Sequence, residues 1–363
     1  MLDESYIQIA IELAKKGKGK VSPRPLCGAL LVKNDKIIGA AYRNSPSDQS
    51  PEITAIQGSR ESTSGAVLYT NLEPCTFSEK EFDCIDIIIE SGISKIVIGS
   101  VNPNKNLGGT SVRKLKKSGI EVITGILEKE CIELNKFFFK HTVSSHPYVT
   151  LKMAATVDGK IADKSGNSKW ITSVETRSMC HELRSEYDAV LVGYNTVKID
   201  NPHLTVSLVE GRNPGRIILD TDLKISPKSD LVQKNYDRNL MIVTSDKNKT
   251  KNKKLTRLAV HGVEVIFVRE KKNNYLDLSD ILKKLGDRNI TSILVEGGRK
   301  VFTSFINEKL EDEVLIFMGP KILGDGSSLT GNLGIKGLPK ALTYYFKDID
   351  KVGEDVLLRL ERR

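Results

Sequence analysis

Two cysteines and a glutamate in the first part of the chain form the pattern of a catalytic zinc site. Cys75 and Cys84 would hold the metal as thiolates, and Glu52 would move a proton between a metal-bound water and a leaving group. A zinc ion that activates water needs three protein ligands and one open position. The third ligand would stand at Ser50, whose neutral hydroxyl is a poor zinc ligand, and all five histidines lie beyond residue 140. The sequence alone leaves open whether zinc binds here.

Two other residues could complete the ligand set, and a simpler interpretation needs no metal. Cys27 or Asp48 would give three thiolates, or two thiolates and a carboxylate. Free cysteines, however, are more often buried as small apolar residues. Ser50 followed by Pro51 is also a typical helix start, with serine at the N-cap and proline in the first turn. Both interpretations stay open at this point.

The second half of the chain carries residues suited to hydride transfer. Val295-Glu296-Gly297-Gly298 reads as a strand that ends in an acid and two glycines, with a helical pattern after it. Glycines there let backbone N–H groups approach a pyrophosphate at a helix N-terminus, although such a pair is more often only a turn. Lys152 interrupts an apolar strand, where burial without a partner is costly, so we expect it to be paired or functional.

Two further polar residues of this half could serve a site. The planar guanidinium of Arg184 could bind a phosphate with two hydrogen bonds, although an arginine on a helix is more often solvated. Asp200 could accept hydrogen bonds from ribose hydroxyls or assist proton delivery, or it could belong to a plain Asp-Asn-Pro turn. These residues predict a reductase site only in combination.

Helical and strand patterns alternate along the chain, which predicts an α/β architecture. A helical apolar face at Ile7, Ala10, Ile11 and Ala14 ends at Gly17. In the first half we expect strands at 28–32, 66–70, 95–99 and 121–123 and helices at 51–60, 83–91 and 111–118. In the second half we expect strands at 149–155, 189–193, 216–220, 240–244, 263–268, 292–296, 314–318 and 356–360.

The expected strands are too many for one small sheet, and a chain of 363 residues is long enough for two domains. The polar stretch Ser144-Ser145-His146-Pro147 ends in proline, so we place the boundary there and expect domains at 1–146 and 147–363. No apolar run reaches about 18 residues and no leader pattern is present, which predicts a soluble cytoplasmic protein without membrane contact. Five cysteines in so long a chain do not suggest a disulfide framework.

A net charge of +9 is compatible with nucleic acid or with phosphorylated small molecules as partners. The densest basic stretch, Lys247 to Lys254, contains no aromatic residue on which bases could stack. We therefore expect a solvated loop there and no nucleic-acid partner.

Short motifs from one end of the chain to the other carry a resemblance to a known family. They are Ser22-Pro23-Arg24-Pro25-Leu26-Cys27-Gly28-Ala29, Leu72-Glu73-Pro74-Cys75 with Cys84, Val101-Asn102-Pro103-Asn104, Leu151-Lys152-Met153-Ala154, Val157-Asp158-Gly159-Lys160-Ile161-Ala162, Lys169-Trp170-Ile171-Thr172, Asp200-Asn201-Pro202, Val295-Glu296-Gly297-Gly298 and Pro320-Lys321-Ile322-Leu323-Gly324. Together they resemble the bifunctional deaminase/reductase family of riboflavin biosynthesis. The resemblance implies a cytidine-deaminase-like α/β/α domain followed by an α/β domain like dihydrofolate reductase.

The resemblance also implies roles for single residues. NADPH would contact Ala154, Trp170, Thr172, Thr196, Asp200, Gly297 and Gly298. The substrate, a ribosylaminopyrimidine 5′-phosphate, would contact Ser168, Arg184, Leu204 and Glu296. Catalysis would rest on Lys152, Asp200 and Glu296 in the reductase, and on Glu52 if the deaminase is active.

The sequence departs from the family pattern at five positions. In the first half, Arg24 replaces an asparagine, Arg43 and Phe77 each replace a histidine, and Ser50 replaces the zinc histidine. In the second half, Ser207 stands where the family commonly has an arginine, so phosphate anchoring would rest on Arg184 or move to Arg212 or Arg216.

These departures favour one functional hypothesis over three others. We expect an NADPH-dependent reductase of riboflavin biosynthesis, a homo-oligomer whose deaminase-like domain is inactive while a separate protein deaminates. The second hypothesis keeps both activities through an atypical zinc site. The third is a nucleic-acid-binding protein on the deaminase fold, which leaves the reductase motifs unexplained. The fourth is a reductase of a related pterin or pyrimidine.

Overall fold

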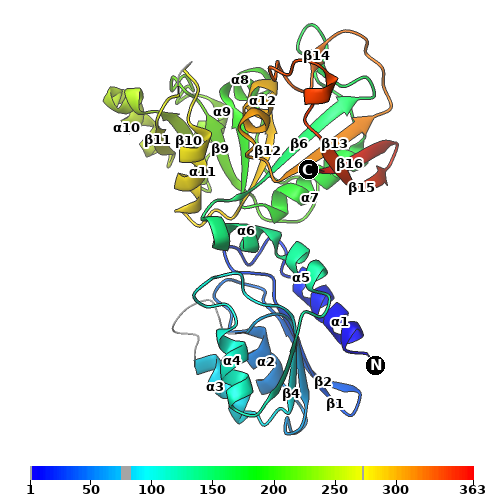
Figure 1. Cartoon of the computed structure of the whole chain (residues 1–363). Coiled ribbons are helices and arrows are strands. Elements are labelled where there is room, and N and C mark those ends of the chain that lie inside the picture. Colours follow the sequence, from blue (N-terminus) through cyan, green and yellow to red (C-terminus); the bar gives the residue numbers. More distant parts are fainter. Residues whose placement is uncertain (1, 75–82, 272–273) are drawn as a thin grey trace. The chain divides into compact units, whose positions relative to one another are not determined.

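The computed structural model describes residues 2–74, 83–271 and 274–363 (Figure 1). The chain divides into two compact units, Met1–Ser145 and His146–Arg363, and each is considered by itself. Within the described part of the chain, no helix is long and apolar enough to cross a membrane.

The first unit is a five-stranded sheet in the order β2-β1-β3-β4-β5. β1 pairs antiparallel with β2 and with β3, whereas β3, β4 and β5 are parallel. The strands are β1 (Gly28–Lys33), β2 (Lys36–Tyr42), β3 (Val67–Leu72), β4 (Lys95–Ser100) and β5 (Glu121–Thr124). The helices are α1 (Asp3–Lys15), α2 (Pro51–Gln57), α3 (Asp83–Glu90), α4 (Thr110–Lys117), α5 (Glu128–Leu134) and α6 (Lys136–Ser144).

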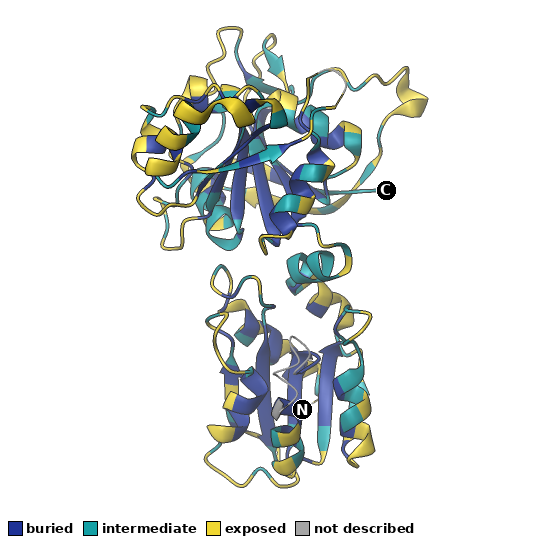
Figure 2. Ribbon diagram, turned by 90° about the vertical axis from the view of Figure 1, so that its left-hand side faces the viewer, coloured by how far each residue is buried: buried dark blue, intermediate teal, exposed yellow. Residues whose placement is uncertain are grey.

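Successive side chains along each strand of this unit point to opposite faces of the sheet, so the unit has two hydrophobic cores, one on each face. On β1, Ala29 and Leu31 pack with residues of α2, α3 and α4, whereas Leu30 and Val32 pack with residues of α1 and α5. β3 and β4 divide their side chains in the same way. The result is the expected α/β/α sandwich, whose sheet strands are buried (Figure 2).

The second unit is a nine-stranded sheet in the order β11-β10-β9-β8-β12-β6-β13-β16-β15. The strands from β11 to β13 in this order are parallel, and β16 and β15 are antiparallel. Their bounds are β6 (Tyr148–Thr156), β8 (Ala189–Gly193), β9 (Gly215–Leu219), β10 (Leu240–Ser245), β11 (Glu264–Val268), β12 (Ser292–Gly297), β13 (Glu313–Gly319), β15 (Tyr344–Val352) and β16 (Asp355–Arg362). A two-stranded sheet joins β7 (Lys160–Ala162) to β14 (Ser327–Ser328).

Helices cover this sheet and close its core. They are α7 (Val174–Glu186), α8 (Tyr194–Asp200), α9 (Asp230–Gln233), α10 (Asn252–Val260), α11 (Leu278–Gly286) and α12 (Arg299–Glu308), with 3-10 turns η2 (Asp246–Thr250) and η3 (Leu338–Lys340). A large cluster around Val149, Leu151 and Phe305 fills one side of the sheet. A smaller cluster around Cys180 and Phe317 lies under α7. The parallel strands end at one edge, and the site is built there.

Candidate functional site

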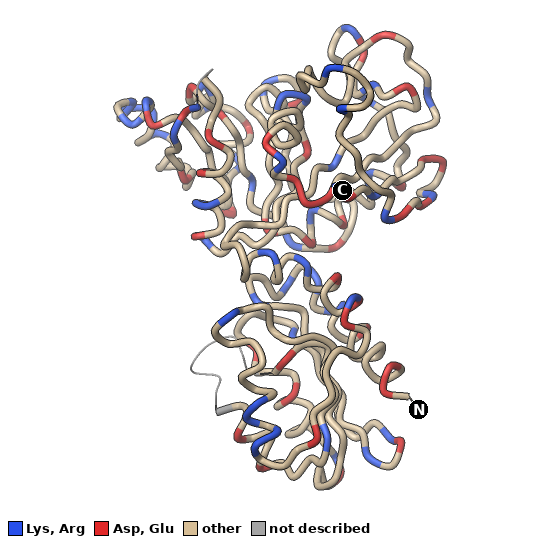
Figure 3. Tube along the Cα trace, viewed as in Figure 1, with Lys and Arg blue, Asp and Glu red and all other residues tan. Residues whose placement is uncertain are grey.

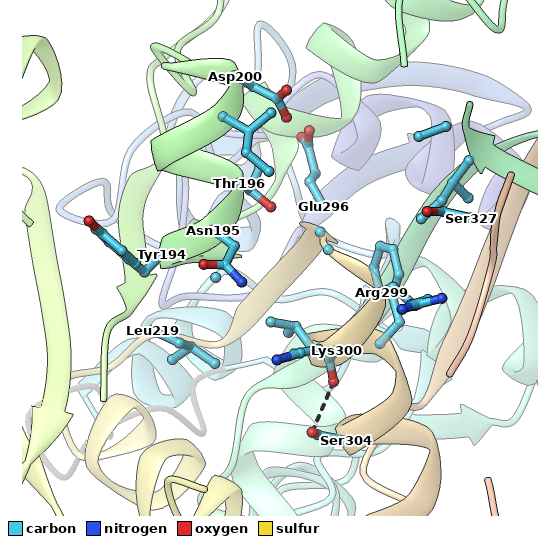
Figure 4. Close-up of a pocket in the computed structure, with 18 of the residues that line it drawn as sticks. Tyr194, Asn195, Thr196, Asp200, Leu219, Glu296, Arg299, Lys300, Ser304 and Ser327 are labelled. Carbon is cyan, nitrogen blue, oxygen red and sulfur yellow. Dashed lines mark hydrogen bonds between the residues drawn. The ribbon is translucent and has the colours of Figure 1, made fainter. Parts of the chain in front are cut away.

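A cavity of about 840 Å³ opens at the carboxyl ends of the parallel strands in the second unit. Ligands of open α/β sheets bind at such an edge, where loops leave the strands. Ten residues expected from the sequence line it: Lys152, Ala154, Ser168, Trp170, Thr172, Thr196, Asp200, Glu296, Gly297 and Gly298. In Figure 4, Thr196 and Asp200 reach this space from α8, and Glu296, Arg299 and Lys300 reach it from the end of β12 and the start of α12.

Glu296 and Arg184 form a bidentate ion pair beside the cavity. Arg184 Nε donates to Glu296 Oε1 at 2.6 Å and its second terminal nitrogen donates to Oε2 at 2.7 Å, while the remaining nitrogen donates to the carbonyl of Thr205 at 3.1 Å. Only 7% of the Glu296 side chain and 16% of that of Arg184 are exposed. Burial raises the pKa of Glu296, but the charge and hydrogen bonds of Arg184 hold it below its usual range. Glu296 is therefore a carboxylate at neutral pH.

Lys152 brings the opposite charge to the same space. Its ammonium lies 5.8 Å from the centre of the Phe317 ring and next to the thiol of Cys180. Burial opposes the charged form of Lys152, but Cys180 and Glu296 outweigh it and raise its pKa above the ordinary value. Its neighbours are thus a thiol, an aromatic ring and the Glu296 carboxylate, and a functional or paired role for Lys152 stays a prediction. The cavity contains a carboxylate and an ammonium that both stay charged at neutral pH.

The two glycines after β12 lead directly into α12. Gly298 is the N-cap of this ten-residue helix, so the first backbone N–H groups of α12 have no side-chain cap and face the end of the cavity. A Cβ atom on Gly298 would come within 3.2 Å of the Thr196 hydroxyl, so the glycine keeps this approach open. Such a helix start is suited to a pyrophosphate.

Trp170 and Asp200 line the cavity from exposed segments. The indole of Trp170 is 61% exposed, and the guanidinium of Arg177 stacks over it at 4.2 Å. Burial raises the pKa of Asp200, and Lys169 partly offsets that shift. Sequence reasoning missed other lining residues, among them Tyr194, Asn195, Asp222 and Lys224. Their only sequence signal was their place within four residues after a predicted strand.

Arg184 and Leu204 are not among the residues that line the cavity. Leu204 is only 3% exposed, and its φ of 58° lies in the left-handed region. The alternative phosphate anchors lie outside the cavity as well. Arg212 pairs with Asp188 at 2.9 Å, and the buried Arg216 bonds to Asn235 and Asp237. The backbone N–H of Ser207 donates to His181.

In the first unit, Glu52 is held by two hydroxyl groups. Its side chain lies on α2 and is 2% exposed. Thr70 donates to Oε1 at 2.6 Å, and Ser50 donates to Oε2. Ser50 is the N-cap residue of α2, but its side chain makes no capping hydrogen bond. The predicted helix start is therefore confirmed, with Ser50 at the N-cap and Pro51 in the first turn, but the Ser50 hydroxyl donates its hydrogen bond to Glu52 and not to a backbone group.

The described donors of this unit do not make up a zinc site. Asp48 already accepts the backbone N–H groups of Asn44 and Ser45 at 2.8 Å each, and Cys27 is buried. Arg43, 2% exposed, donates to the Asp48 carbonyl and adds positive charge beside these candidates. Among the described residues no three histidines, cysteines or acids lie together as a metal site. Cys75 and Phe77 lie outside the described residues, and Cys84 packs in the core beside α2.

Comparison with protein families places both units. A family model described as "RibD C-terminal domain" matches residues 147–358, and one described as "Cytidine and deoxycytidylate deaminase zinc-binding region" matches residues 1–100. The riboflavin biosynthesis protein RibD of Aquifex aeolicus is 41% identical over 99% of both chains. The chain belongs to the RibD family. RibD of Actinobacillus pleuropneumoniae is 36% identical over 99% of this chain and 95% of its own.

Solved structures of RibD proteins have the same two-domain fold. The diaminohydroxyphosphoribosylaminopyrimidine deaminase/5-amino-6-(5-phosphoribosylamino)uracil reductase of Thermotoga maritima is 36% identical, with a TM-score of 0.87 over 99% of both chains. Acinetobacter baumannii RibD is 29% identical, with a TM-score of 0.89 over 99% of both chains. The chain is thus a riboflavin-biosynthesis enzyme with a cytidine-deaminase-like domain and a RibD reductase domain.

Proposed function

We propose that this RibD protein reduces 5-amino-6-(5-phosphoribosylamino)uracil with NADPH and that its N-terminal domain does not deaminate. The observation that carries the reductase proposal is the cavity in which Lys152 and the Arg184-bound Glu296 meet the glycine-led start of α12. Lys152 and Glu296 would provide charges that bind a polar substrate. The start of α12 would provide backbone N–H groups that bind a dinucleotide.

The residues of the cavity fit NADPH. Gly297, Gly298 and the N-terminus of α12 would hold the pyrophosphate, with Thr196 beside them. Ala154, Trp170 and Thr172 line the same cavity as Lys152 and would position the nicotinamide. When bound, NADPH supplies the hydride that reduces C1 of the opened ribose.

The charged residues of the cavity would bind the substrate and supply the proton. Glu296, held as a carboxylate, accepts hydrogen bonds from hydroxyl or amino groups of the substrate, and Arg184 positions it. Lys152, held as an ammonium, stabilises negative charge that develops on the substrate and can donate the proton that balances the hydride. Asp200 and Ser168 line the same space and would contact the ribose hydroxyls and the substrate.

The proposal of a silent deaminase domain is supported by the environment of Glu52. A general acid and base must reach a metal-bound water, but both carboxylate oxygens of Glu52 accept protein hydroxyls, and Ser50 contributes a neutral donor where a ligand is needed. A separate enzyme would then supply the deaminated substrate. The match of residues 1–100 to a zinc-binding deaminase model favours the second candidate, a bifunctional enzyme with an atypical zinc site.

One experiment decides between these two functions. The purified protein is offered the diaminopyrimidine and the aminouracil forms of the ribosylamino phosphate separately, each with NADPH. Oxidation of NADPH with the aminouracil form alone, without ammonia from the other form, is the expected result. Ammonia release would overturn the silent-domain proposal, and absence of NADPH oxidation with the aminouracil form would overturn the reductase proposal.

We further propose that the protein self-associates through the edge strand β15. This strand ends the nine-stranded sheet, and its side chains Tyr345, Phe346 and Ile349 are 43%, 61% and 62% exposed. Edge strands with exposed apolar side chains are surfaces on which another chain pairs. A second copy of the same strand is the occupant that this edge suits, because antiparallel pairing across a two-fold axis is self-complementary.

A further inference from the structure

Trp170 lines the reductase cavity from an exposed part of the chain. Its side chain is 61% exposed, and residues 164–169 before it are exposed as well. The place of the indole in the cavity therefore depends on how the chain is held after it. We call the four residues from Trp170 to Ser173 the tryptophan segment, of which the first three line the cavity.

Two carbonyl groups of the tryptophan segment contact the loop and strand end around residue 320. Lys321 donates to the carbonyl of Trp170, but this lysine is exposed, so water competes for the bond. The carbonyl of Ile171 rests against the end of β13, where a Cβ atom on Gly319 would come within 2.2 Å of its oxygen. This contact needs a glycine, but it supplies no hydrogen bond.

The third attachment is the buried carboxylate of Asp355. This residue begins β16, in a hairpin with β15 that carries several acidic and basic residues (Figure 3). Asp348 and Asp350 of the hairpin are exposed, whereas Asp355 is only 1% exposed. Its Oδ2 atom accepts the backbone N–H of Ser173 at 2.7 Å and the hydroxyl of Thr176 at 2.6 Å. Asp355 thus ties the segment to the sheet.

Both donors to Asp355 belong to the start of α7. Ser173 is the N-cap residue of this helix, and Thr176 lies in its first turn. A buried carboxylate is costly without hydrogen bonds, and an acid at a helix N-terminus is favoured by the helix dipole. Asp355 therefore fixes the beginning of α7 against β16, and the tryptophan segment ends at this fixed point.

We propose that Asp355 is a positioning residue of the reductase, which fixes the tryptophan segment as a wall of the cavity and so sets the affinity for NADPH. This inference rests on the proposed function, in which Trp170 helps to position the nicotinamide. Asp355 does not line the cavity, so its effect on a ligand passes through Ser173. Without this acceptor the segment moves more freely, and NADPH must order it on binding.

The test measures the dissociation constant of NADPH on the full-length protein by quenching of tryptophan fluorescence, since Trp170 is the single tryptophan of the chain. Asp355→Ala should weaken NADPH binding about five- to tenfold, the range that one intramolecular hydrogen bond contributes to an equilibrium. The KM for NADPH should rise in parallel, while kcat and the KM for the aminouracil substrate change less than about twofold. Arg184 still holds Glu296 in this variant, because that pair lies at the far end of α7.

A second measurement reports on the segment without any ligand. The fluorescence anisotropy of Trp170 in the free protein should fall in Asp355→Ala, because the indole gains freedom of motion. Thr176→Val is a milder variant that removes one of the two donors that orient the carboxylate. It should weaken NADPH binding about two- to threefold, at the lower end of the contribution of a hydrogen bond.

Two controls separate positioning from stability and from charge. In Asp188, Oδ2 likewise accepts a backbone N–H and a hydroxyl, both from Thr291 at 2.7 Å, but at the amino ends of β8 and β12, the sheet edge opposite the cavity. Asp188→Ala should destabilise the fold and leave the NADPH affinity and the anisotropy unchanged. Asp355→Asn keeps a carbonyl acceptor for Ser173 and should bind NADPH within about twofold of the wild-type protein.

Unchanged NADPH affinity and anisotropy in Asp355→Ala, or in Thr176→Val should the first variant not fold, would overturn the inference and leave the reductase proposal in place. Equal weakening by Asp188→Ala or by Asp355→Asn would overturn it as well, since stability or charge would then explain the effect. Absence of NADPH binding and oxidation in the wild-type protein would instead overturn the reductase proposal.

Discussion

Arg184 holds Glu296 through two parallel hydrogen bonds of 2.6 and 2.7 Å, although 112 residues separate them in the chain. The arginine lies on α7 and the glutamate at the end of β12. Since both are largely buried, each makes the charge of the other tolerable. The pair therefore keeps Glu296 ionised beside the cavity.

Arg184→Ala should lower the free energy of unfolding of the reductase domain by about 3–5 kcal/mol at pH 8, because it leaves a buried carboxylate without its partner. Trp170, the single tryptophan of the chain, lies in this domain, so its fluorescence during urea unfolding is the measurement. Arg288→Ala, which breaks the exposed pair with Glu264, is the control and should cost less than about 1 kcal/mol. Equal losses in the two variants would contradict the prediction.

The same variant should show a characteristic dependence on pH. In the wild-type protein the pKa of Glu296 is lowered, so the pair stabilises the fold above the unfolded pKa and this contribution is lost as pH falls through the folded pKa. Without Arg184, burial dominates and raises that pKa, so the variant gains stability where the acid is protonated. The difference between wild type and variant should shrink from pH 8 to pH 4. A difference independent of pH would exclude an ionised Glu296.

Lys152→Met should lower the kcat of NADPH oxidation by about 10²–10⁴-fold, the usual contribution of a positioned proton donor. The KM for NADPH should change little, because the side chain acts on the substrate. Since the pKa of Lys152 is raised, the wild-type rate should show no loss of the ammonium until above the usual lysine range. Lys198→Met, an exposed lysine of α8 outside the cavity, is the control. Equal kcat values for both variants would remove Lys152 from the mechanism.

The purified protein should hold far less than one zinc per chain after dialysis against zinc, measured by elemental analysis. The physical reason is that Ser50 offers a neutral hydroxyl that is already donated to Glu52. Glu52→Gln should leave NADPH oxidation unchanged, because Glu52 belongs to the other domain. About one zinc per chain, together with ammonia release that Glu52→Gln abolishes, would establish the bifunctional alternative.

Ile349→Asp should shift the protein toward the monomer in analytical ultracentrifugation. A charge on β15 would meet its symmetry copy in the proposed edge-to-edge contact, and like charges opposite each other destabilise paired strands. Leu338→Asp places the same charge on a more exposed apolar residue away from this strand and should have no effect. An unchanged sedimentation profile for Ile349→Asp would exclude β15 as the interface.

Strands with strong apolar patterns were predictable from the sequence, and polar edge strands were not. The expected strand at 189–193 coincides with β8, and those at 28–32 and 95–99 differ from β1 and β4 by one residue at one end. β15 was missed because it is mostly exposed and carries four charged residues between Lys347 and Lys351. β2 was also missed, although Asn34-Asp35 is a sequence signal for the turn before it. Both residues have positive φ, which is the geometry of a two-residue hairpin turn between β1 and β2.

The members of the reductase site could be predicted, but their mutual contacts could not. Lys152 and Glu296 were identified by a charge in an apolar strand and an acid at a strand end, and both line the cavity. The pairing of Glu296 with Arg184 was not predicted, because the two residues lie far apart in the sequence and no short motif connects α7 with β12. Arg184 was therefore assigned to a phosphate, whereas its guanidinium is occupied by Glu296 and Thr205.

β6 pairs with β12 on one side and β13 on the other, and Lys152 lies in its middle. Amide protons of this strand should be among the last to exchange with deuterated solvent, because both ladders must open first. The segment from Lys164 to Trp170 is exposed throughout and should exchange early. In the proposed function, Lys152 would thus stay fixed between two strand ladders, whereas Trp170 lies on an exposed segment whose ordering would carry the entropic cost of binding the nucleotide.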